Sequence, residues 1–278
     1  MLSLSSTIAS VAQAIDNFAR RKTVASAWNT ADWAQAPAEI VSRSFFSAGV
    51  ESGRFLAEAR SGITAALDVS RDQYGRLPDR EKFVADLRGV ALRLGLGTPD
   101  KPNDLKNLAG ARRLGIIWDM NVNSANGRAR RSAGLSQGAL FAAPAQELVR
   151  GRNARVPRDW TARWQEAGAQ VDWEGALRTR FVALKTSPIW LELSRFGTPW
   201  APFDFGSGMI LRNISRDKAV SLGLLQEDEI LEPDPDPAYN DGLAATMQGV
   251  PDDVAEAVQN LMPDRVERVG NDLKWRAA

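Results

Sequence analysis

The chain has 278 residues, of which 44% are hydrophobic and 25% charged, the balance of a folded globular protein. It contains neither histidine nor cysteine, which excludes Ser-His-Asp and Cys-His nucleophiles, His- or Cys-ligated zinc, iron–sulfur clusters and disulfides. The net charge is +1, but the charges are unevenly distributed along the chain. The stretch from Arg112 to Arg163 contains ten arginines and three acidic residues, whereas the stretch from Gln226 to Asp264 contains eleven acidic residues and no basic one.

The first expected element is an amphipathic helix near the N-terminus. Apolar residues recur there at 4-3-4-3 spacing, which is typical of one helical face. Two interpretations stay open, because such a face packs either on its own domain or on a helix of a partner chain. The partner-helix face would consist of Leu4, Ile8, Val11, Ile15 and Phe18.

Long helices are expected in the rest of the first half. A connector carrying Trp28 and Trp33 leads to a proline-free stretch over residues 37–68, which predicts a rod of roughly 45 Å. A third helix is expected to start at Asp79 and to end at the glycines at positions 95 and 97. A loop over residues 98–103 then precedes a fourth helix over about residues 105–140, which five glycines weaken.

Short elements are expected after Pro144. Short strands are predicted over 146–150, 181–185 and 209–214, and helices over 159–167, 188–193 and 215–222. The acidic Asp-Pro run at 234–237 predicts an extended linker. It would lead to a helix over 252–261 and a hairpin over 266–275 around Gly270.

The expected fold class is therefore α+β and mainly α, with a bundle of long helices followed by a small mixed α/β module with short strands. The predicted domains are a helical partner-docking domain over 1–143, the α/β module over 144–225, and an acidic linker with a helix and hairpin arm over 226–278. No run approaches the roughly 20 apolar residues of a membrane span, and Asp16 interrupts the N-terminal apolar positions, which argues against a signal peptide.

The order of motifs resembles one known family. An arginine-rich helical part holds Ile117-Trp118-Asp119-Met120-Asn121, a later step holds Pro188-Ile189-Trp190, and Trp200-Ala201-Pro202-Phe203 closes the succession. This order is similar to that of the phage Mu F-like minor head proteins, the head morphogenesis family, over roughly residues 15–225. The motif residues to which the resemblance assigns a structural role are Trp118, Asn121, Trp190, Trp200, Pro202 and Phe203.

One departure from the family is clear. Many members end the closing segment with a histidine and a Cys-x-Cys, whereas this chain has Phe203 to Met209 there. Any role that those polar residues have in other members is therefore absent here or replaced by apolar packing.

The resemblance implies a structural virion protein, present in a few copies inside the phage head near the portal vertex, and in the host cytoplasm during assembly. Its implied partners are the portal protein and other head proteins, with non-specific contact to packaged DNA. No membrane, cofactor, metal or catalytic residue is implied, and the chain is not expected to be an enzyme.

The basic stretch is the candidate binding surface for this role. Arginines that neutralise phosphates give sequence-independent affinity for DNA, and the same charge would suit an acidic portal surface. A third interpretation is a solvated helix face that the chain's own acidic segment neutralises. The candidate DNA or portal contacts are Arg112, Arg113, Arg128, Arg130, Arg131, Arg150, Arg152 and Arg155.

Two other function classes remain open. One is an effector enzyme delivered with the genome, either ADP-ribosyltransferase-like or a hydrolase that uses carboxylates. The other is a sequence-independent DNA-binding protein. Trp160, Trp164, Trp190 and Trp200 are expected to be core anchors of the α/β module, and a solid module filled by them would disfavour the enzyme.

Overall fold

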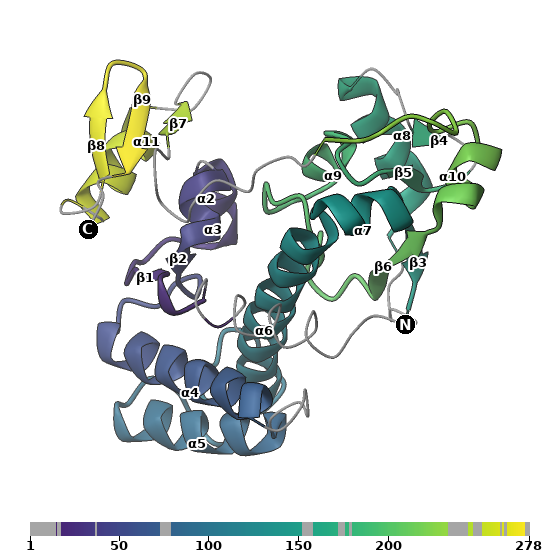
Figure 1. Ribbon diagram of the computed structural model, residues 1–278. Helices are drawn as coiled ribbons and strands as arrows, with labels where there is room; N and C mark the ends of the chain where they lie inside the picture. The colour runs from purple at the N-terminus through teal and green to yellow at the C-terminus, as the bar shows by residue number, and fades with distance from the viewer. Residues whose placement is uncertain are drawn as a thin grey trace. The chain divides into compact units, whose positions relative to one another are not determined.

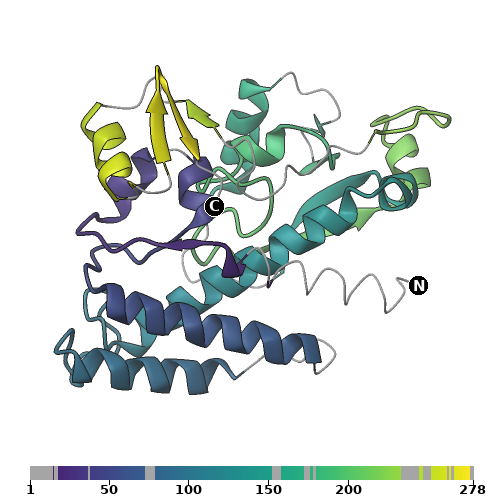
Figure 2. The ribbon, with the colours of Figure 1, turned by 60° about the vertical axis from the view of Figure 1, so that its left-hand side comes forward.

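The computed structural model describes residues 15, 18–36, 38–72, 79–151, 158–171, 176–177, 180–232, 244–246, 252–261, 263 and 266–275. It is mainly helical with small sheets, which confirms the predicted α+β, mainly α class (Figures 1 and 2). The chain forms two compact units: unit 1 is Met1–Ala125 with Pro237–Ala278, and unit 2 is Asn126–Asp236. The domain boundaries predicted from the sequence lie after residues 143 and 225.

Unit 1 begins with short elements that the sequence did not predict. Strand β1 (Lys22–Thr23) pairs in parallel with β2 (Ser44–Phe45). Helix α2 (Thr30–Gln35) occupies part of the expected connector, and its capping box is complete, because Asn29 accepts from the Asp32 amide and Asp32 accepts from the Asn29 amide. Helix α3 (Ala38–Arg43) follows.

The predicted rod over residues 37–68 is wrong. The chain leaves the helix after Arg43 because Ser44 and Phe45 pair with β1, a distant partner that no local pattern reveals. Gly49 has a φ of +67°, a conformation that glycine adopts without a steric penalty. Helix α4 (Gly53–Asp72) then starts afresh, with the Ser52 hydroxyl accepting from the Phe55 amide.

Helices α4 and α5 (Arg80–Arg93) lie side by side (Figures 1 and 2). Asp79 caps α5 by accepting from the amides of Glu81 and Lys82, and Gly95 follows its end at a φ of +68°. Both ends of this helix are therefore as predicted.

The fourth predicted helix starts later than expected and is broken. Helix α6 covers Ala111–Gly134, and α7 (Gln137–Ala142) follows after Leu135 and Ser136. The preceding loop stays non-helical because the Asn107 amide group bonds to backbone atoms of Thr98, Lys101 and Ala109.

The C-terminal elements pack against the N-terminal ones in unit 1. Helix α11 (Asp252–Leu261) and the antiparallel strands β8 (Val266–Val269) and β9 (Asp272–Trp275) are found where a helix and a hairpin were predicted, and β7 (Ala244–Thr246) pairs with β9. Val266 and Leu273 share one apolar core with Val24, Trp33 and Ile40. The described strands are therefore part of a core and do not form a free arm. The Asp-Pro run at 234–237, predicted as a linker, lies outside the described residues.

Unit 2 is built on a four-stranded sheet of order β4-β5-β3-β6. The strands are β3 (Ala145–Arg150), β4 (Ala176–Leu177), β5 (Val182–Leu184) and β6 (Met209–Ile214), and the pairs β3–β5, β3–β6 and β4–β5 are antiparallel. Apart from β4, they match the predicted strands within two residues at each end.

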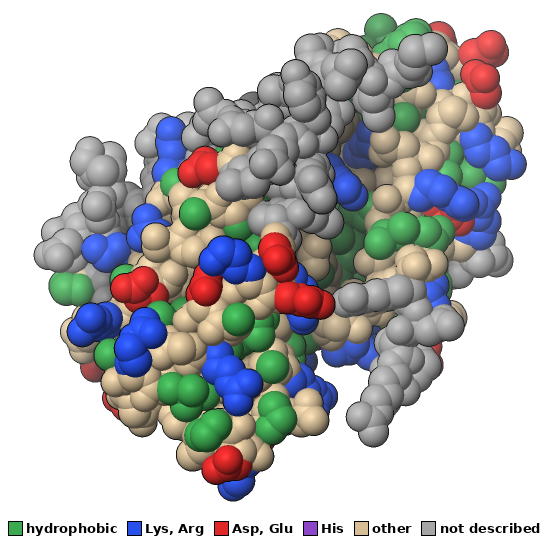
Figure 3. Space-filling view, turned by 90° about the horizontal axis from the view of Figure 1, so that it is seen from below, with side chains coloured by type: hydrophobic (Ala, Val, Ile, Leu, Met, Phe, Trp, Pro, Cys, Tyr) green, Lys and Arg blue, Asp and Glu red, His purple; other side chains and the backbone are tan. Residues whose placement is uncertain are grey.

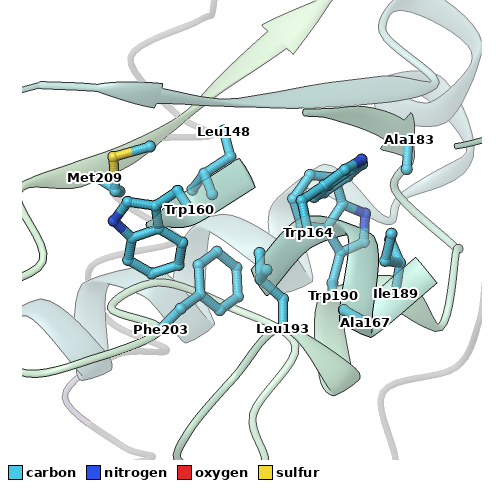
Figure 4. Packing of buried hydrophobic residues seen from close by; sticks show 10 residues of the cluster. All are labelled: Leu148, Trp160, Trp164, Ala167, Ala183, Ile189, Trp190, Leu193, Phe203 and Met209. Carbon is cyan, nitrogen blue, oxygen red and sulfur yellow. The ribbon is translucent and has the colours of Figure 1, made fainter. Parts of the chain in front are cut away.

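Residues of strands β3 and β5 contribute to two separate apolar cores, one on each face of this sheet. Leu148 and Ala183 join α8 (Trp160–Gln170) and α9 (Ile189–Glu192) in one core, whereas Ala145 and Val182 join α10 (Arg216–Ser221) in the other. Trp160, Trp164 and Trp190 fill the first core (Figure 4), as predicted. Three large aromatic side chains thereby stabilise a module of short elements.

Candidate functional site

The first two predicted contact arginines differ in exposure. Arg112, at the start of α6, is exposed. Arg113 is half-buried and donates to the carbonyl oxygens of Leu105 and Ala48, and burial lowers the pKa of its guanidinium. Arg113 therefore ties two loops of unit 1 to α6.

The arginines at the C-terminal end of α6 also differ in exposure. Arg128 is buried with its guanidinium 5.6 Å from the ring centre of Trp200. Arg131 donates to the carbonyl oxygens of Lys185 and Pro199 at 3.2 and 3.4 Å. Arg130, between them in sequence, is exposed. Arg128 and Arg131 thus hold the segment around residues 185–200 on α6.

The predicted arginines do not form one described surface. Arg150 is exposed at the end of β3, while Arg152 and Arg155 lie outside the described residues. Of the predicted arginines that the structure describes, Arg112 in unit 1 and Arg130 and Arg150 in unit 2 are exposed. On the face drawn in Figure 3, Lys and Arg side chains are interspersed with acidic and hydrophobic ones.

The described end of the predicted partner-helix face is buried within unit 1. Ile15 and Phe18 are 5% and 1% exposed, and Phe18 packs edge-on against Phe45. These two residues therefore support the interpretation that the face packs on its own domain. Leu4, Ile8 and Val11 lie outside the described residues.

The family-motif residues on α6 have structural contacts. Trp118 is buried against Phe83, with ring centres 4.8 Å apart. Asn121 accepts from Arg21 and donates to the Ile117 carbonyl oxygen. This motif joins α6 to α5 and to the segment before β1.

The later motif residues close the first core of unit 2. Trp190 donates from Nε1 to the Leu184 carbonyl oxygen at 2.8 Å and stacks on Phe203, which is 1% exposed (Figure 4). Trp200 is 8% exposed and Pro202 is half-buried. The residues that carry the resemblance thus hold this unit together.

A cluster of charges that sequence reasoning missed surrounds Asp204. Its side chain is 5% exposed, forms an ion pair with Arg158 at 2.8 Å and accepts a hydrogen bond from Arg163 at 2.9 Å, while Arg195 lies 3.6 Å away. We call these four residues the Asp204 cluster. Arg158 precedes α8, Arg163 lies on α8, and Arg195 and Asp204 lie in two separate loops, so no local motif could have revealed the cluster.

Unit 2 holds two further buried charges. Burial raises the pKa of Glu147, but hydrogen bonds from Arg212 and Arg180 outweigh that effect and hold the pKa of this carboxyl below its usual value. Lys185 is 5% exposed, and burial lowers the pKa of its ammonium group to about 8. Its Nζ lies 3.4 Å from the Gly134 carbonyl oxygen at the end of α6.

Within the described part of the chain, no group of three or more His, Cys, Asp and Glu side chains has the arrangement of a metal site. A search of the helices in that part also finds none that is long and apolar enough to span a membrane. Comparison with known proteins returns no matching family model, no matching curated protein and no matching solved structure.

Proposed function

We propose that this chain is a structural protein of a phage particle, a minor head subunit that associates with the portal and the capsid interior. The order of the motifs, from Ile117–Asn121 through Trp190 to Trp200–Phe203, supports this proposal. The observation that carries it is the use of those residues: Trp118, Trp190, Trp200 and Phe203 are all buried. These side chains build the core of the chain and not a reactive site, as we expect of a structural subunit.

The contacts of the buried carboxylates favour this role over an enzyme. A general acid or base must exchange a proton with a substrate. Glu147 and Asp204, the buried carboxylates among the residues that the structure describes, are instead bound by two and three arginines. These ion pairs hold both carboxylates in place.

Non-specific contact with packaged DNA is a part of this proposal that the exposed arginines support. Arg130 and Arg150 are exposed on unit 2 and Arg112 on unit 1, so each is free to approach a phosphate. Counterion release predicts that affinity falls steeply with salt. A gel mobility shift of the full chain with unrelated duplexes measures this, and equal affinity in low and high salt would remove DNA from the proposal.

The main test is the copy number of the chain in purified particles from the genome that encodes it. Quantitative mass spectrometry against the major shell subunit is expected to give a few copies per particle, as for a subunit confined to the portal vertex. A copy number equal to that of the shell subunit, or absence from purified particles and procapsids, would contradict the proposal.

A further inference from the structure

We propose that the Asp204 cluster is a phosphate-binding site that takes a doubly charged phosphate group. The proposal is independent of the virion role and of the arginines predicted from sequence. Arg158, Arg163 and Arg195 converge on one carboxylate from separate segments of unit 2.

The cluster holds more positive charge than its carboxylate neutralises. Among the residues that the structure describes, three guanidinium groups against one carboxylate leave an excess of two positive charges. Their side chains are 34%, 24% and 45% exposed, so the excess faces solvent. The nearest acidic neighbour in sequence, Asp159, directs its carboxylate to the Ala162 amide as the cap of α8.

Hydrogen-bond donors also remain unused in the cluster. A guanidinium carries five N–H donors. Among the described residues, Arg163 donates one N–H to Asp204. The Arg195 guanidinium lies 3.6 Å from Asp204, beyond hydrogen-bond distance. Arg195 thus has a full set of donors available for a ligand.

The arginines are held in place before any ligand arrives. Arg163 lies 5.1 Å from the ring centre of Trp160, and Arg195 lies 5.8 Å from that of Phe205. Arg158 donates to the Phe205 carbonyl oxygen, and the Phe205 amide donates to Asp204 at 2.7 Å. Ordering the side chains beforehand reduces the entropy lost on binding.

The charge favours a phosphate over a carboxylate ligand. Asp204 already supplies one carboxylate to the guanidinium groups, and the remaining excess of two charges matches a phosphate monoester, which carries about −1.5 to −2 at pH 7. Arginine binds phosphate oxygens through paired N–H donors, which gives the site its geometry.

An exposed aromatic ring beside the cluster points to the source of the phosphate. Phe205 is 36% exposed and packs edge-on against Phe196, with ring centres 4.9 Å apart. Such a ring offers a surface on which a nucleobase can stack. A free nucleotide and the phosphorylated end of a nucleic acid share this chemistry.

Calorimetric titration of the full chain at roughly 0.05 M salt, where surface charges are weakly screened, tests the proposal. The probes are inorganic phosphate, a nucleoside 5′-monophosphate, and a short single strand with and without a 5′-phosphate. We expect saturable phosphate binding that weakens at least about tenfold in Arg195→Gln, the effect of losing one charge-assisted hydrogen bond. The Arg195→Lys variant keeps the positive charge but lacks the paired N–H donors of a guanidinium, so it should bind phosphate with intermediate affinity.

Lys218→Gln is the matched control, because Lys218 is an exposed cation on α10 of the same unit. It should leave the affinity unchanged. Tighter binding of the nucleotide than of inorganic phosphate identifies a free nucleotide, and still tighter binding of the phosphorylated strand identifies a nucleic-acid end. No saturable binding of any phosphate probe, equal loss in Lys218→Gln, or tighter binding of an acidic peptide than of every phosphate probe would overturn the proposal.

Discussion

Burial divides the arginines around α6 and unit 2 into two groups with different effects when they are replaced. Arg113 and Arg131 donate to backbone carbonyl oxygens, and Arg128 covers Trp200. Arg112 and Arg130 are exposed. The composition of the stretch could not separate these groups, because neighbours such as Arg130 and Arg131 look alike in sequence and differ only in what the fold places beside them.

Arg131→Gln and Arg130→Gln form a matched pair. Arg131→Gln should destabilise the chain by about 1–2 kcal/mol because it removes bonds to two carbonyl oxygens. Arg130→Gln should change stability by less than about 0.5 kcal/mol, as is usual for an exposed side chain. Urea unfolding measures both, and equal effects would show that Arg131 does not hold residues 185 and 199 on α6.

Lys185 gives the chain a pH dependence above neutrality. Its pKa is about 8 in the folded chain and 10.5 for an ordinary lysine. Between these values the unfolded chain binds more protons, so stability rises with pH through this window, by up to about 3 kcal/mol for a shift of this size. Below pH 8 the buried ammonium group lowers stability throughout.

Lys185→Met should therefore stabilise the chain at pH 7 and remove this rise. The measurement is the free energy of unfolding of wild type and variant at several pH values between 7 and 10.5, with Lys218→Met as the exposed control. An unchanged pH dependence in Lys185→Met would show that the group titrates normally.

At the scale of elements, the C-terminal part of α6 depends on close backbone contact. A Cβ atom added to Gly127 would lie 1.9 Å from the Ala201 carbonyl oxygen and 3.0 Å from Trp200. A backbone oxygen cannot move aside as a flexible side chain can. Glycine at 127 thus allows the helix to approach the segment that carries Trp200, Pro202 and Phe203.

Gly127→Ala should destabilise the chain by about 1–3 kcal/mol through overpacking. Gly138→Ala is the control on α7, where an added Cβ meets nothing within 4 Å. It should stabilise by about 0.5–1 kcal/mol, since alanine favours a helix. Thermal unfolding distinguishes the two, and stabilisation in both variants would contradict the close approach at Gly127.

Elements with local signals were predictable, and those that depend on distant partners were not. The start of α5 at Asp79 and the bounds of β6 were predicted correctly. Helix α2 has a local signal in Asn29 and Asp32, which form its capping box. Strand β2 had no local signal, because its partner Lys22–Thr23 lies about twenty residues earlier.

For the whole molecule, the main finding is that the two ends of unit 1 share one core. Val24, Trp33 and Ile40 from the N-terminal part pack with Val266 and Leu273. Sequence patterns located the C-terminal helix and hairpin correctly but could not show what they pack against. The candidate sites follow the same rule: the Asp204 cluster joins residues more than 40 positions apart, so only the fold reveals it.

Leu273→Ala tests this shared core. It should destabilise unit 1 by about 2–5 kcal/mol, the usual cost of truncating a buried leucine. Amide hydrogen exchange over residues 30–43 should accelerate, because α2 and α3 lose their packing partner. Val269→Ala, at an exposed position of the same hairpin, is the control. Unchanged exchange over residues 30–43 in Leu273→Ala would mean that the hairpin does not support these helices.

The proposed role as a minor head subunit is tested most directly by locating the chain within an intact particle. Cross-linking mass spectrometry of purified heads identifies its neighbours, and asymmetric imaging of the portal vertex gives its position. We predict cross-links to the portal protein and density on the inner side of that vertex. Cross-links to shell subunits alone, with density distributed evenly over the capsid, would contradict a portal-associated subunit.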